Sequence, residues 1–271
     1  MGRVVVIGAP GHIGTYLVPR LVRAGHEVVA VSRGEREPYH EAVEWEAVQR
    51  VVVDRSTEEA AGTFAERIAG LEPDAVVDLI CFTPASAQHL VDALRPSRPL
   101  LVHCGTIWVH GRSARVAVTE DEPRTAYGEY GTGKVAIEAL LHRETIAGGV
   151  PSVVLHPGHI CGPGWPVITP VGNLDADVWR QLAVGEAVAM PALGLGVLNH
   201  VHADDVAQGF EQALARPGVP LSEQRDRGHA VAKTRRVPTE DRLGLAPVQA
   251  PLKLRGERQL RGTRGHRVRP R

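Results

Sequence analysis

The sequence predicts an α/β fold in which a doubly wound parallel sheet is covered by helices on both faces. Short, solidly apolar segments rich in valine alternate along the chain with segments whose apolar residues recur at helical spacing. Strands that are apolar throughout are typical of parallel sheets, because both of their faces are buried. Of the 271 residues, 43% are hydrophobic, which is enough for a substantial core and excludes a chain that is disordered throughout.

The individual elements follow from this alternation in chain order. Val4 to Ile7 form the first strand, which Gly8 ends. Apolar residues then recur every three or four positions from Ile13 to Val22, which predicts a helix that Gly25 closes. Further strands are expected at residues 28–31, 51–53, 75–80, 100–103 and 152–155. Further helices are expected at residues 57–70, at 85–94 after Pro84, and at 131–146.

Charge is distributed unevenly, although 31 Lys and Arg balance 31 Asp and Glu over the whole chain. Residues 223–271 contain twelve Arg and two Lys against five acidic residues, so they carry +9 and residues 1–222 carry −9. This segment lacks aromatic residues and apolar periodicity, so we expect it to be disordered or loosely docked, apart from one candidate edge strand at 229–231. The change near residue 222 is abrupt enough to suggest a reading-frame change or a truncation.

Composition argues against several classes of protein. No run of 18 apolar residues occurs and the first apolar run is too short for a signal peptide, so we expect no membrane association. Three widely spaced cysteines, Cys81, Cys104 and Cys161, favour a reducing, cytoplasmic compartment over a disulfide framework. His200 and His202 share one face of a candidate strand, but no ligand set has the spacing of a structural zinc site, so no metal is predicted.

A glycine-rich turn with the spacing GxxGxxG joins the first strand to the first helix, which is the context that a dinucleotide site requires. Its glycines permit a tight turn and a close approach of the backbone to a pyrophosphate, which the helix amino terminus attracts. The alternative is a glycine-rich turn without a ligand. We predict a Rossmann-like fold with cofactor contacts from Gly8, Pro10, Gly11, His12, Ile13 and Gly14.

The type of nicotinamide cofactor is indicated by the end of the second strand. An NAD site usually has a carboxylate there, about 20 residues after the turn, to bind the ribose 2′-hydroxyl. This chain has Ser32 and Arg33 instead, and an arginine can pair with a 2′-phosphate, so the sequence favours NADP(H) within the NAD(P) class. Alternatively, Arg33 stacks on adenine or faces solvent. Asp54 either contacts the adenine edge or caps the next helix.

Tyr130 and Lys134 are the candidate catalytic pair. Four residues apart on a helix they share one face, and a nearby ammonium is expected to lower the pKa of the phenol for proton exchange with a substrate hydroxyl or carbonyl. Tyr127 competes, but four residues later it has Gly131. Thr106 follows the fifth strand, where it can bind the same substrate oxygen. The alternatives are a surface Tyr–Lys pair and a threonine that caps a turn.

Over about residues 3–216 the chain resembles the extended short-chain dehydrogenase/reductases, also called the NAD-dependent epimerase/dehydratase family. The resemblance rests on the order of five segments: the glycine turn at 8–14, then 106–111, 130–134, 156–164 and 202–207. It implies that Tyr130 is the general acid/base, that Lys134 lowers its pKa and holds the nicotinamide ribose, and that Thr106 fills a Ser/Thr position.

The resemblance also implies a wider cofactor site and a homodimer formed through helices that flank the sheet. The loop at 157–164 is expected to border the nicotinamide and the substrate. The remaining expected cofactor contacts are Ser32, Arg33, Asp54, Cys81, Phe82, Lys134, His156, Pro157 and His159. The chain departs from the family at His110, where the family often has tyrosine. It also lacks, at residues 198–200, the arginine with which sugar-nucleotide members grip a diphosphate, which weakens the expectation of a nucleotide sugar.

Three domains or segments are predicted. Residues 1–165 form the NAD(P)-binding domain, residues 166–222 a small, incomplete substrate lobe whose helix at 203–216 returns to the sheet, and residues 223–271 the basic tail. Trp108, Trp165 and Trp179 are candidates for lining the pocket, with core packing as the alternative for Trp179 because of its helical spacing from Leu182. The cysteines are interpreted as small buried hydrophobes.

The combined features predict an oxidoreductase or epimerase/dehydratase that acts on a small molecule, such as a sugar or a nucleotide sugar. Hydride passes between the nicotinamide and a substrate carbon while Tyr130 moves the proton. One alternative is a non-catalytic NAD(P)-binding regulator, although such a protein has no need of Thr106, Tyr130 and Lys134 together. Another is a nucleic-acid binder that uses the basic tail, which the absence of aromatic residues there disfavours.

Overall fold

The computed structural model describes residues 2–111, 119, 122–190 and 198–215. The described helices and strands all belong to one compact unit, Met1–Lys233. The predicted basic tail and the candidate edge strand at 229–231 lie outside the described residues. Within the described part, no helix is both long enough and apolar enough to cross a bilayer.

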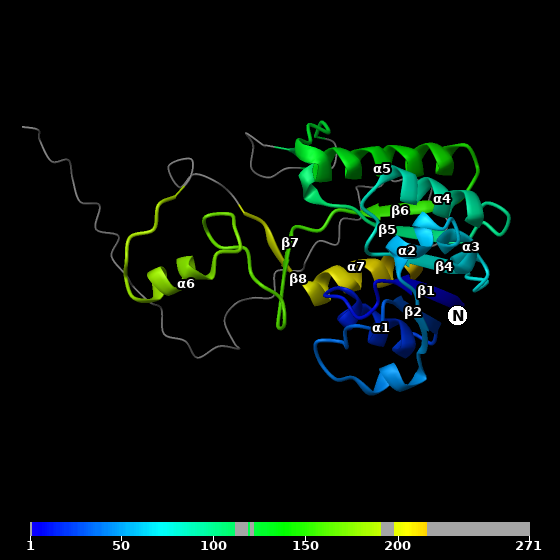
Figure 1. Ribbon diagram of the computed structural model, residues 1–271, viewed down its shortest axis with the longest axis horizontal. Coiled ribbons are helices and arrows are strands. Elements are labelled where there is room, and N and C mark those ends of the chain that lie inside the picture. Colours follow the sequence, from blue (N-terminus) through cyan, green and yellow to red (C-terminus); the bar gives the residue numbers. More distant parts are fainter. Residues whose placement is uncertain (1, 112–118, 120–121, 191–197, 216–271) are drawn as a thin grey trace, which may run out of the picture. The chain divides into compact units, whose positions relative to one another are not determined.

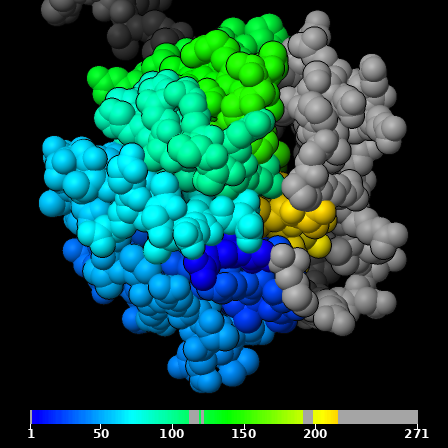
Figure 2. All heavy atoms as spheres, turned by 90° about the vertical axis from the view of Figure 1, so that its right-hand side faces the viewer, coloured from blue at the N-terminus to red at the C-terminus, as the bar shows by residue number. Residues whose placement is uncertain are grey.

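A six-stranded parallel sheet in the order β3-β2-β1-β4-β5-β6 forms the centre of the fold (Figure 1). Its strands are β1 (Arg3–Ile7), β2 (Glu27–Ser32), β3 (Gln49–Val52), β4 (Ala75–Asp78), β5 (Leu100–Cys104) and β6 (Ser152–Leu155). Strand β1 is central, since Val5 pairs with Val29 of β2 on one side and with Val76 of β4 on the other. The predicted parallel α/β sheet is confirmed. Figure 2 shows the molecule from the side of the amino ends of the strands. There the dark blue start of the chain lies between the blue and the cyan segments.

Helices cover both faces of the sheet, so it is doubly wound. α1 (Gly14–Arg23) and α7 (Ala203–Ala215) cover one face, and α3 (Phe64–Ala69), α4 (Pro84–Leu94) and α5 (Gly128–Ile146) cover the other (Figure 1). Because side chains alternate along a strand, β1 supplies both cores: Val4 and Val6 pack with α1 and α7, whereas Val5 and Ile7 pack under α3, α4 and α5.

Two local expectations are corrected by the structure, and one element was not predicted. The helix predicted at 57–70 is two helices, α2 (Arg55–Ala60) and α3, because Gly62 between them has a φ of +72°, which no α-helix accommodates. The strand predicted at 75–80 ends at Asp78. A 3₁₀ helix, η1 (Val43–Ala47), precedes β3 and buries Trp45 beside α1.

The segment after β6 forms a second, two-stranded parallel sheet from β7 (His159–Cys161) and β8 (His200–His202). The helix expected at 203–216 is confirmed as α7, which follows β8 directly. α6 (Ala176–Ala183) buries only Val178, whereas Trp179 and Leu182 are 43% and 46% exposed. The alternative interpretation, in which Trp179 packs in the core, is therefore wrong. The domain boundary at residue 165 stays a prediction.

Phe210 provides a test of how α7 is attached to the sheet. Its side chain is fully buried in the core that α1 shares with β1. The substitution Phe210→Ala is expected to lower the free energy of unfolding by about 3–5 kcal/mol, because it removes apolar contacts and leaves a cavity. Urea unfolding followed by circular dichroism measures the change. The matched control is Ile146→Ala at a side chain on α5 that is 67% exposed, with an expected change within about 0.5 kcal/mol. Equal losses in both variants would contradict the docking of α7 in this core.

Candidate active site

The carboxyl ends of the six parallel strands meet along one edge of the sheet, and the segments that follow them form the candidate site. The glycine turn follows β1. Gly8 has a φ of +87° and donates its N–H to Val31 O at 2.9 Å, which ties the turn to β2. At Gly14 a Cβ would lie only 1.9 Å from Ala9 O, so no side chain fits where α1 starts against the turn. The turn thus has the bare backbone and the helix amino terminus that a pyrophosphate requires.

His12, inside the glycine turn, is buried under aromatic side chains from two other loops. Its ring stacks on Trp165, with centroids 4.9 Å apart and planes 13° apart, and meets the edge of Tyr39 at 5.7 Å. Burial lowers the pKa of His12. Trp165 and Tyr39 line a hollow of about 520 Å³ together with Arg36, Glu37, Gly164 and Pro166. Trp165 therefore borders a pocket as expected, whereas the contribution of the segment at 36–39 was not predicted from the sequence.

The end of β2 presents the residues that were expected to select the cofactor. Arg33 is exposed, and its guanidinium lies 3.2 Å from the carboxylate of Glu35, which is also exposed. Ser32 Oγ accepts the N–H of Gly34. Asp54 caps α2 by accepting the N–H of Thr57 at 3.0 Å, which confirms the capping interpretation; the contact with adenine stays a prediction.

Lys134 lies in the interior of the site and joins three elements. Its side chain is 2% exposed, and Nζ donates to Cys81 O, just beyond β4, at 2.8 Å and to Cys104 O, at the end of β5, at 2.6 Å. Burial lowers the pKa of the ammonium. Lys134 is thereby held at the carboxyl edge of the sheet, and Phe82 lies 5.1 Å from Nζ, measured to the ring centroid.

Tyr130 lies one turn before Lys134 on α5 and is 47% exposed, so its phenol is open to a ligand. Its ring centroid lies 6.4 Å from that of Phe82 and 6.0 Å from Lys134 Nζ. Burial raises the pKa of Tyr130, and a hydrogen bond with Thr106 opposes the increase only in part. The ammonium of Lys134 donates to two backbone carbonyls, and the prediction that it lowers the pKa of Tyr130 stays a prediction.

Thr106 caps the 3₁₀ helix η2 (Ile107–His110) by accepting the N–H of Trp108 at 3.3 Å, which confirms the capping interpretation. Its hydroxyl also acts to lower the pKa of Tyr130. The contact of Thr106 with a substrate oxygen stays a prediction. Trp108 is 40% exposed and stands between the rings of Tyr127 and His159, at 6.0 and 6.1 Å.

The loop after β6 contacts both the Thr106 segment and α5. Pro157 O accepts the N–H of Ile107 at 3.2 Å. His156 Nε2 lies 3.2 Å from the carboxylate of Glu138, which also pairs with Arg124 at 2.8 Å. Burial alone would raise the pKa of Glu138, but the contacts with His156 and Arg124 outweigh it and lower the pKa to about 2. Glu138 was not predicted as a site residue, although its position four residues after Lys134 places it on the same face of the helix.

A buried ion pair lies behind the site. Both Asp78 oxygens accept from Arg55 Nη1, at 2.8 and 3.0 Å, and neither side chain is exposed by more than a tenth. Asp78, Cys81 and His103 form a group whose potential ligand atoms lie within 4.8 Å of one another. Arg55 already pairs with the carboxylate of Asp78, and Lys134 adds a second positive charge nearby. This group of three side chains therefore does not suit a metal cation.

The cysteines were expected to be small buried hydrophobes. Cys81 and Cys104 are buried, and burial raises the pKa of their thiols to about 12 and about 11. Thiols that keep their protons at neutral pH are poor nucleophiles, which agrees with the expectation. Cys161 on β7 is only partly buried.

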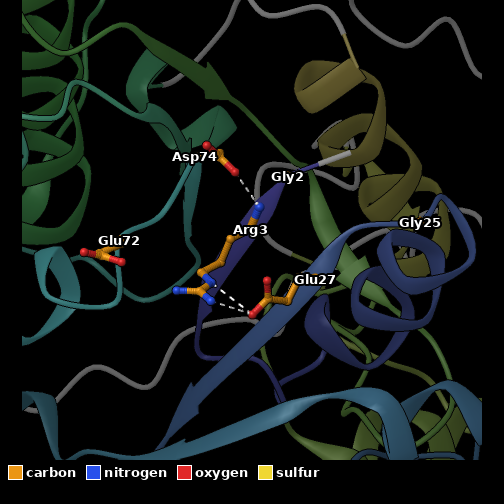
Figure 3. Close-up of a pocket in the computed structure, with 6 residues that line it drawn as sticks. All are labelled: Gly2, Arg3, Gly25, Glu27, Glu72 and Asp74. Atoms are coloured by element: carbon orange, nitrogen blue, oxygen red, sulfur yellow. Dashed lines mark hydrogen bonds and ion pairs between the residues drawn. The ribbon is translucent and has the colours of Figure 1, made fainter.

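A second hollow, of about 490 Å³, lies at the opposite edge of the sheet (Figure 3). It is lined by the starts of β1 and β2 and by the segment before β4. In it, Arg3 pairs with Glu27 at 2.9 Å and donates its backbone N–H to Asp74 at 2.7 Å. Ligands of open parallel sheets bind at the carboxyl ends of the strands, so this hollow is not part of the candidate site.

Comparisons with known proteins agree with this geometry. Residues 4–223 match the NAD dependent epimerase/dehydratase family. The chain is 28% identical to 2′-dehydrokanamycin reductase of Streptomyces kanamyceticus over 215 residues, which cover 79% of this chain and 58% of the reductase. It is 27% identical to UDP-glucose 4-epimerase of Azospirillum brasilense, over 78% of this chain and 68% of the epimerase. The chain thus spans less than two thirds of the length of the reductase.

Among solved structures, the chain is similar to UDP-glucose 4-epimerase from Bifidobacterium longum in complex with NAD+ and UDP. The TM-score is 0.61 at 20% sequence identity, over 80% of this chain and 75% of the epimerase. A similarity at this level of sequence identity supports the shared fold and says nothing about the substrate.

The Arg55–Asp78 pair gives a test of the electrostatics behind the site. Asp78→Ala is expected to lower the free energy of unfolding by up to about 3–5 kcal/mol, because Arg55 Nη1 loses its buried partner and only Glu59 still pairs with the guanidinium. The double variant Asp78→Leu with Arg55→Met removes both charges and is expected to lose less than the single variant. Urea unfolding at neutral pH measures both. A double variant that is less stable than Asp78→Ala would contradict the interpretation that the unpaired charge causes the loss.

Proposed function

The chain belongs to the NAD dependent epimerase/dehydratase family, and on that premise we propose that it passes hydride between NAD(P) and a carbohydrate that bears a hydroxyl or carbonyl group. The observation that carries the proposal is the placement of Lys134 at the carboxyl edge of the sheet, where it donates to Cys81 O and Cys104 O, with the ring of Tyr130 6.0 Å from its ammonium. A partly exposed phenol at this edge is suited to bind and protonate a substrate oxygen.

The residues present fit a dinucleotide. The glycine turn leaves a bare backbone at Gly14, where a Cβ would collide with Ala9 O, and α1 begins directly behind it. Gly8 to Gly14 would hold the pyrophosphate, and the segments around Ser32, Phe82 and Pro157 would border the adenosine and the nicotinamide. When bound, the cofactor supplies the hydride donor and acceptor.

The proposed roles of the chain's own residues follow from their surroundings. Tyr130 transfers a proton to or from the substrate oxygen, and Thr106 orients that oxygen by a hydrogen bond. Because the pKa of Tyr130 is raised, the phenol keeps its proton at neutral pH, which suits protonation of a carbonyl oxygen during reduction. Lys134 fixes α5 to β4 and β5 and brings a positive charge to the side of the ribose.

The substrate class is proposed from the relatives. Two of them are a 2′-dehydrokanamycin reductase and a UDP-glucose 4-epimerase, and both names describe a substrate that contains a sugar. Residues 198–200 of this chain, Leu-Asn-His, lack an arginine for a diphosphate. We therefore place the substrate with sugar ketones and alcohols that need not carry a nucleotide.

We further propose NADP(H) as the preferred form of the cofactor. Family members use NAD, and this chain has no acidic residue at the end of β2 to bind a ribose 2′-hydroxyl. Arg33 is exposed there, and its present partner Glu35 is exposed as well, so the guanidinium can exchange that partner for a 2′-phosphate at small cost.

Tyr130→Phe tests the catalytic role. The variant is expected to lower kcat by about 10²–10⁴-fold, because proton transfer to the substrate oxygen is lost, while the Kd for cofactor stays unchanged. Turnover is followed by NAD(P)H absorbance with sugar ketones and with UDP-sugars, and binding by NAD(P)H fluorescence. Tyr127→Phe is the matched control, because Tyr127 lies at the start of the same helix without a lysine one turn later. Full activity of Tyr130→Phe would exclude this role, and cofactor binding without turnover of any substrate by the unmodified protein would favour a regulator.

Arg33→Ala tests the cofactor preference. Titration with NADPH is expected to show binding weakened by about tenfold or more, because a charge-assisted contact with the 2′-phosphate is lost, whereas NADH binding stays the same. Arg36→Ala, which removes another arginine from the same loop, shows whether the effect depends on position. Equal affinities of the unmodified protein for NADH and NADPH would contradict the preference.

A further inference from the structure

Two aromatic side chains form a corner in the hollow beside the glycine turn. The rings of Tyr39 and Trp165 have centroids 6.2 Å apart and planes 81° apart, so one ring forms a floor and the other a wall. Both line the hollow of about 520 Å³, together with Gly164 and Pro166. His12 stacks on one face of Trp165 and is only 6% exposed, whereas Trp165 is 40% exposed. The opposite face and the edges of Trp165 are therefore left for a ligand.

The corner is held in place by the backbone around it. At Gly164, where φ is +80°, a Cβ would collide with Tyr39 Cδ1, so the phenol ring packs directly on this glycine. Tyr39 N donates to Thr15 Oγ1 of α1 at 3.2 Å, and Trp165 N donates to Gly162 O at the same distance. A ligand thus meets rings that are already in position, which lowers the entropic cost of binding.

Polar groups stand at the rim of the corner. Arg36 and Glu37 also line the hollow, and both are exposed. Glu37 accepts from Arg50 Nη1 at 2.9 and 3.1 Å, which brings a second guanidinium to its carboxylate. The rim therefore supplies N–H donors and carboxylate oxygens within one hollow. Hydroxyl groups both donate and accept, so a ligand with several hydroxyls can use both kinds of group, whereas a phosphate would meet the carboxylate of Glu37.

A chair-shaped sugar ring matches a corner of two perpendicular aromatic rings. Its axial C–H groups can lie on the face of one aromatic ring while the C–H groups of its edge contact the other. Its hydroxyls surround the ring and point toward the rim. A flat base gains most from stacking between parallel rings, and Tyr39 is not parallel to Trp165. An apolar floor with a few polar groups at its edge is also the usual composition of a small-molecule site.

The hollow lies apart from the proposed catalytic residues. Its aromatic residues follow β2 and β7, and Tyr39 is attached to α1. Tyr130 lies instead on α5, beside Phe82, which follows β4. β1 separates β2 from β4, so these two strands are about 10 Å apart, and α1 and α5 cover opposite faces of the sheet. A sugar ring in the corner is therefore a different ring from the one whose oxygen meets Tyr130.

We propose that the corner of Tyr39 and Trp165 binds a sugar ring of the substrate that does not itself react. The substrate class is then a glycoside of two or more rings, one ring at Tyr130 and another in the hollow. The inference rests on the proposed function for the reacting ring, whereas the binding of a sugar in the hollow does not depend on catalysis. Tyr39 and Trp165 act as residues that determine the size of the substrate.

Binding of small sugars tests the corner without turnover. The probes are the methyl glycosides of glucose, galactose and mannose, and methyl maltoside, titrated up to about 100 mM and followed by saturation-transfer NMR, because single sugar rings bind weakly. Tyr39→Ala and Trp165→Ala each remove one ring and are expected to weaken binding by about tenfold or more. Tyr39→Phe keeps the ring and binds as the unmodified protein. Trp179→Ala is the matched control, because Trp179 is 43% exposed on α6.

The same titrations contain the outcomes that would overturn the inference. These are the absence of saccharide binding to the unmodified protein, and a loss in Trp179→Ala equal to that in Trp165→Ala. Adenosine is titrated as a flat ligand: if Tyr39→Ala weakens adenosine binding and leaves saccharide binding unchanged, the corner binds a base and the inference fails. Circular dichroism shows whether each variant is folded. Arg36→Ala, at an exposed side chain, keeps the test valid if the ring variants unfold, with an expected loss of about fivefold and an unchanged affinity as the contrary result.

Kinetics distinguishes a failure of the inference from a failure of the proposed function. Tyr39→Ala is expected to raise KM by about tenfold for a two-ring sugar ketone and to leave kcat unchanged, because the reacting oxygen still meets Tyr130. For a one-ring ketone, KM is expected to stay the same. An equal rise in KM for both substrates, or a fall in kcat alone, overturns the inference. If saccharides bind at the corner and none is turned over, the proposed function fails and the sugar site remains.

Discussion

The contact between the Lys134 ammonium and two backbone carbonyls is the constraint on which the site depends. A buried charge is stable only when polar groups replace the water that it has lost, and here the carbonyls of Cys81 and Cys104 do so at 2.8 and 2.6 Å. Both carbonyls lie at the carboxyl edge of the sheet, one beyond β4 and the other at the end of β5. The contact can form only if these strands are neighbours and α5 lies directly over them.

The position of α5 then determines the positions of the other functional groups. Tyr130 and Glu138 lie one turn to either side of Lys134, so the first lies beside the ring of Phe82 and the second reaches the loop after β6. The Arg55–Asp78 pair acts on the same ammonium, because the charges of Asp78 and Arg55 shift the pKa of Lys134 in opposite directions.

The other half of the site follows from the strand order. β1 lies between β2 and β4, so the glycine turn after β1 opens between the segment after β2 and the Cys81–Phe82 segment after β4. Such a crevice between the ends of adjacent strands is where open parallel sheets bind ligands. The relatives include a reductase and epimerases, so proteins similar to this chain carry out more than one reaction.

The sequence by itself determined the features that depend on local pattern. Apolar periodicity predicted the parallel sheet and most of its elements, the glycine spacing located the turn, and the interval of four residues placed Tyr130 and Lys134 on one face of a helix. Only the tertiary structure decided what surrounds these residues. It separated α2 from α3 at Gly62, raised the pKa of Tyr130 by burial, and brought His156 to Glu138 across 18 positions of chain. Periodicity shows on which face of its own helix or strand a residue lies. The burial and the electrostatic surroundings of that residue depend on groups that are distant in the sequence and meet only when the chain is folded.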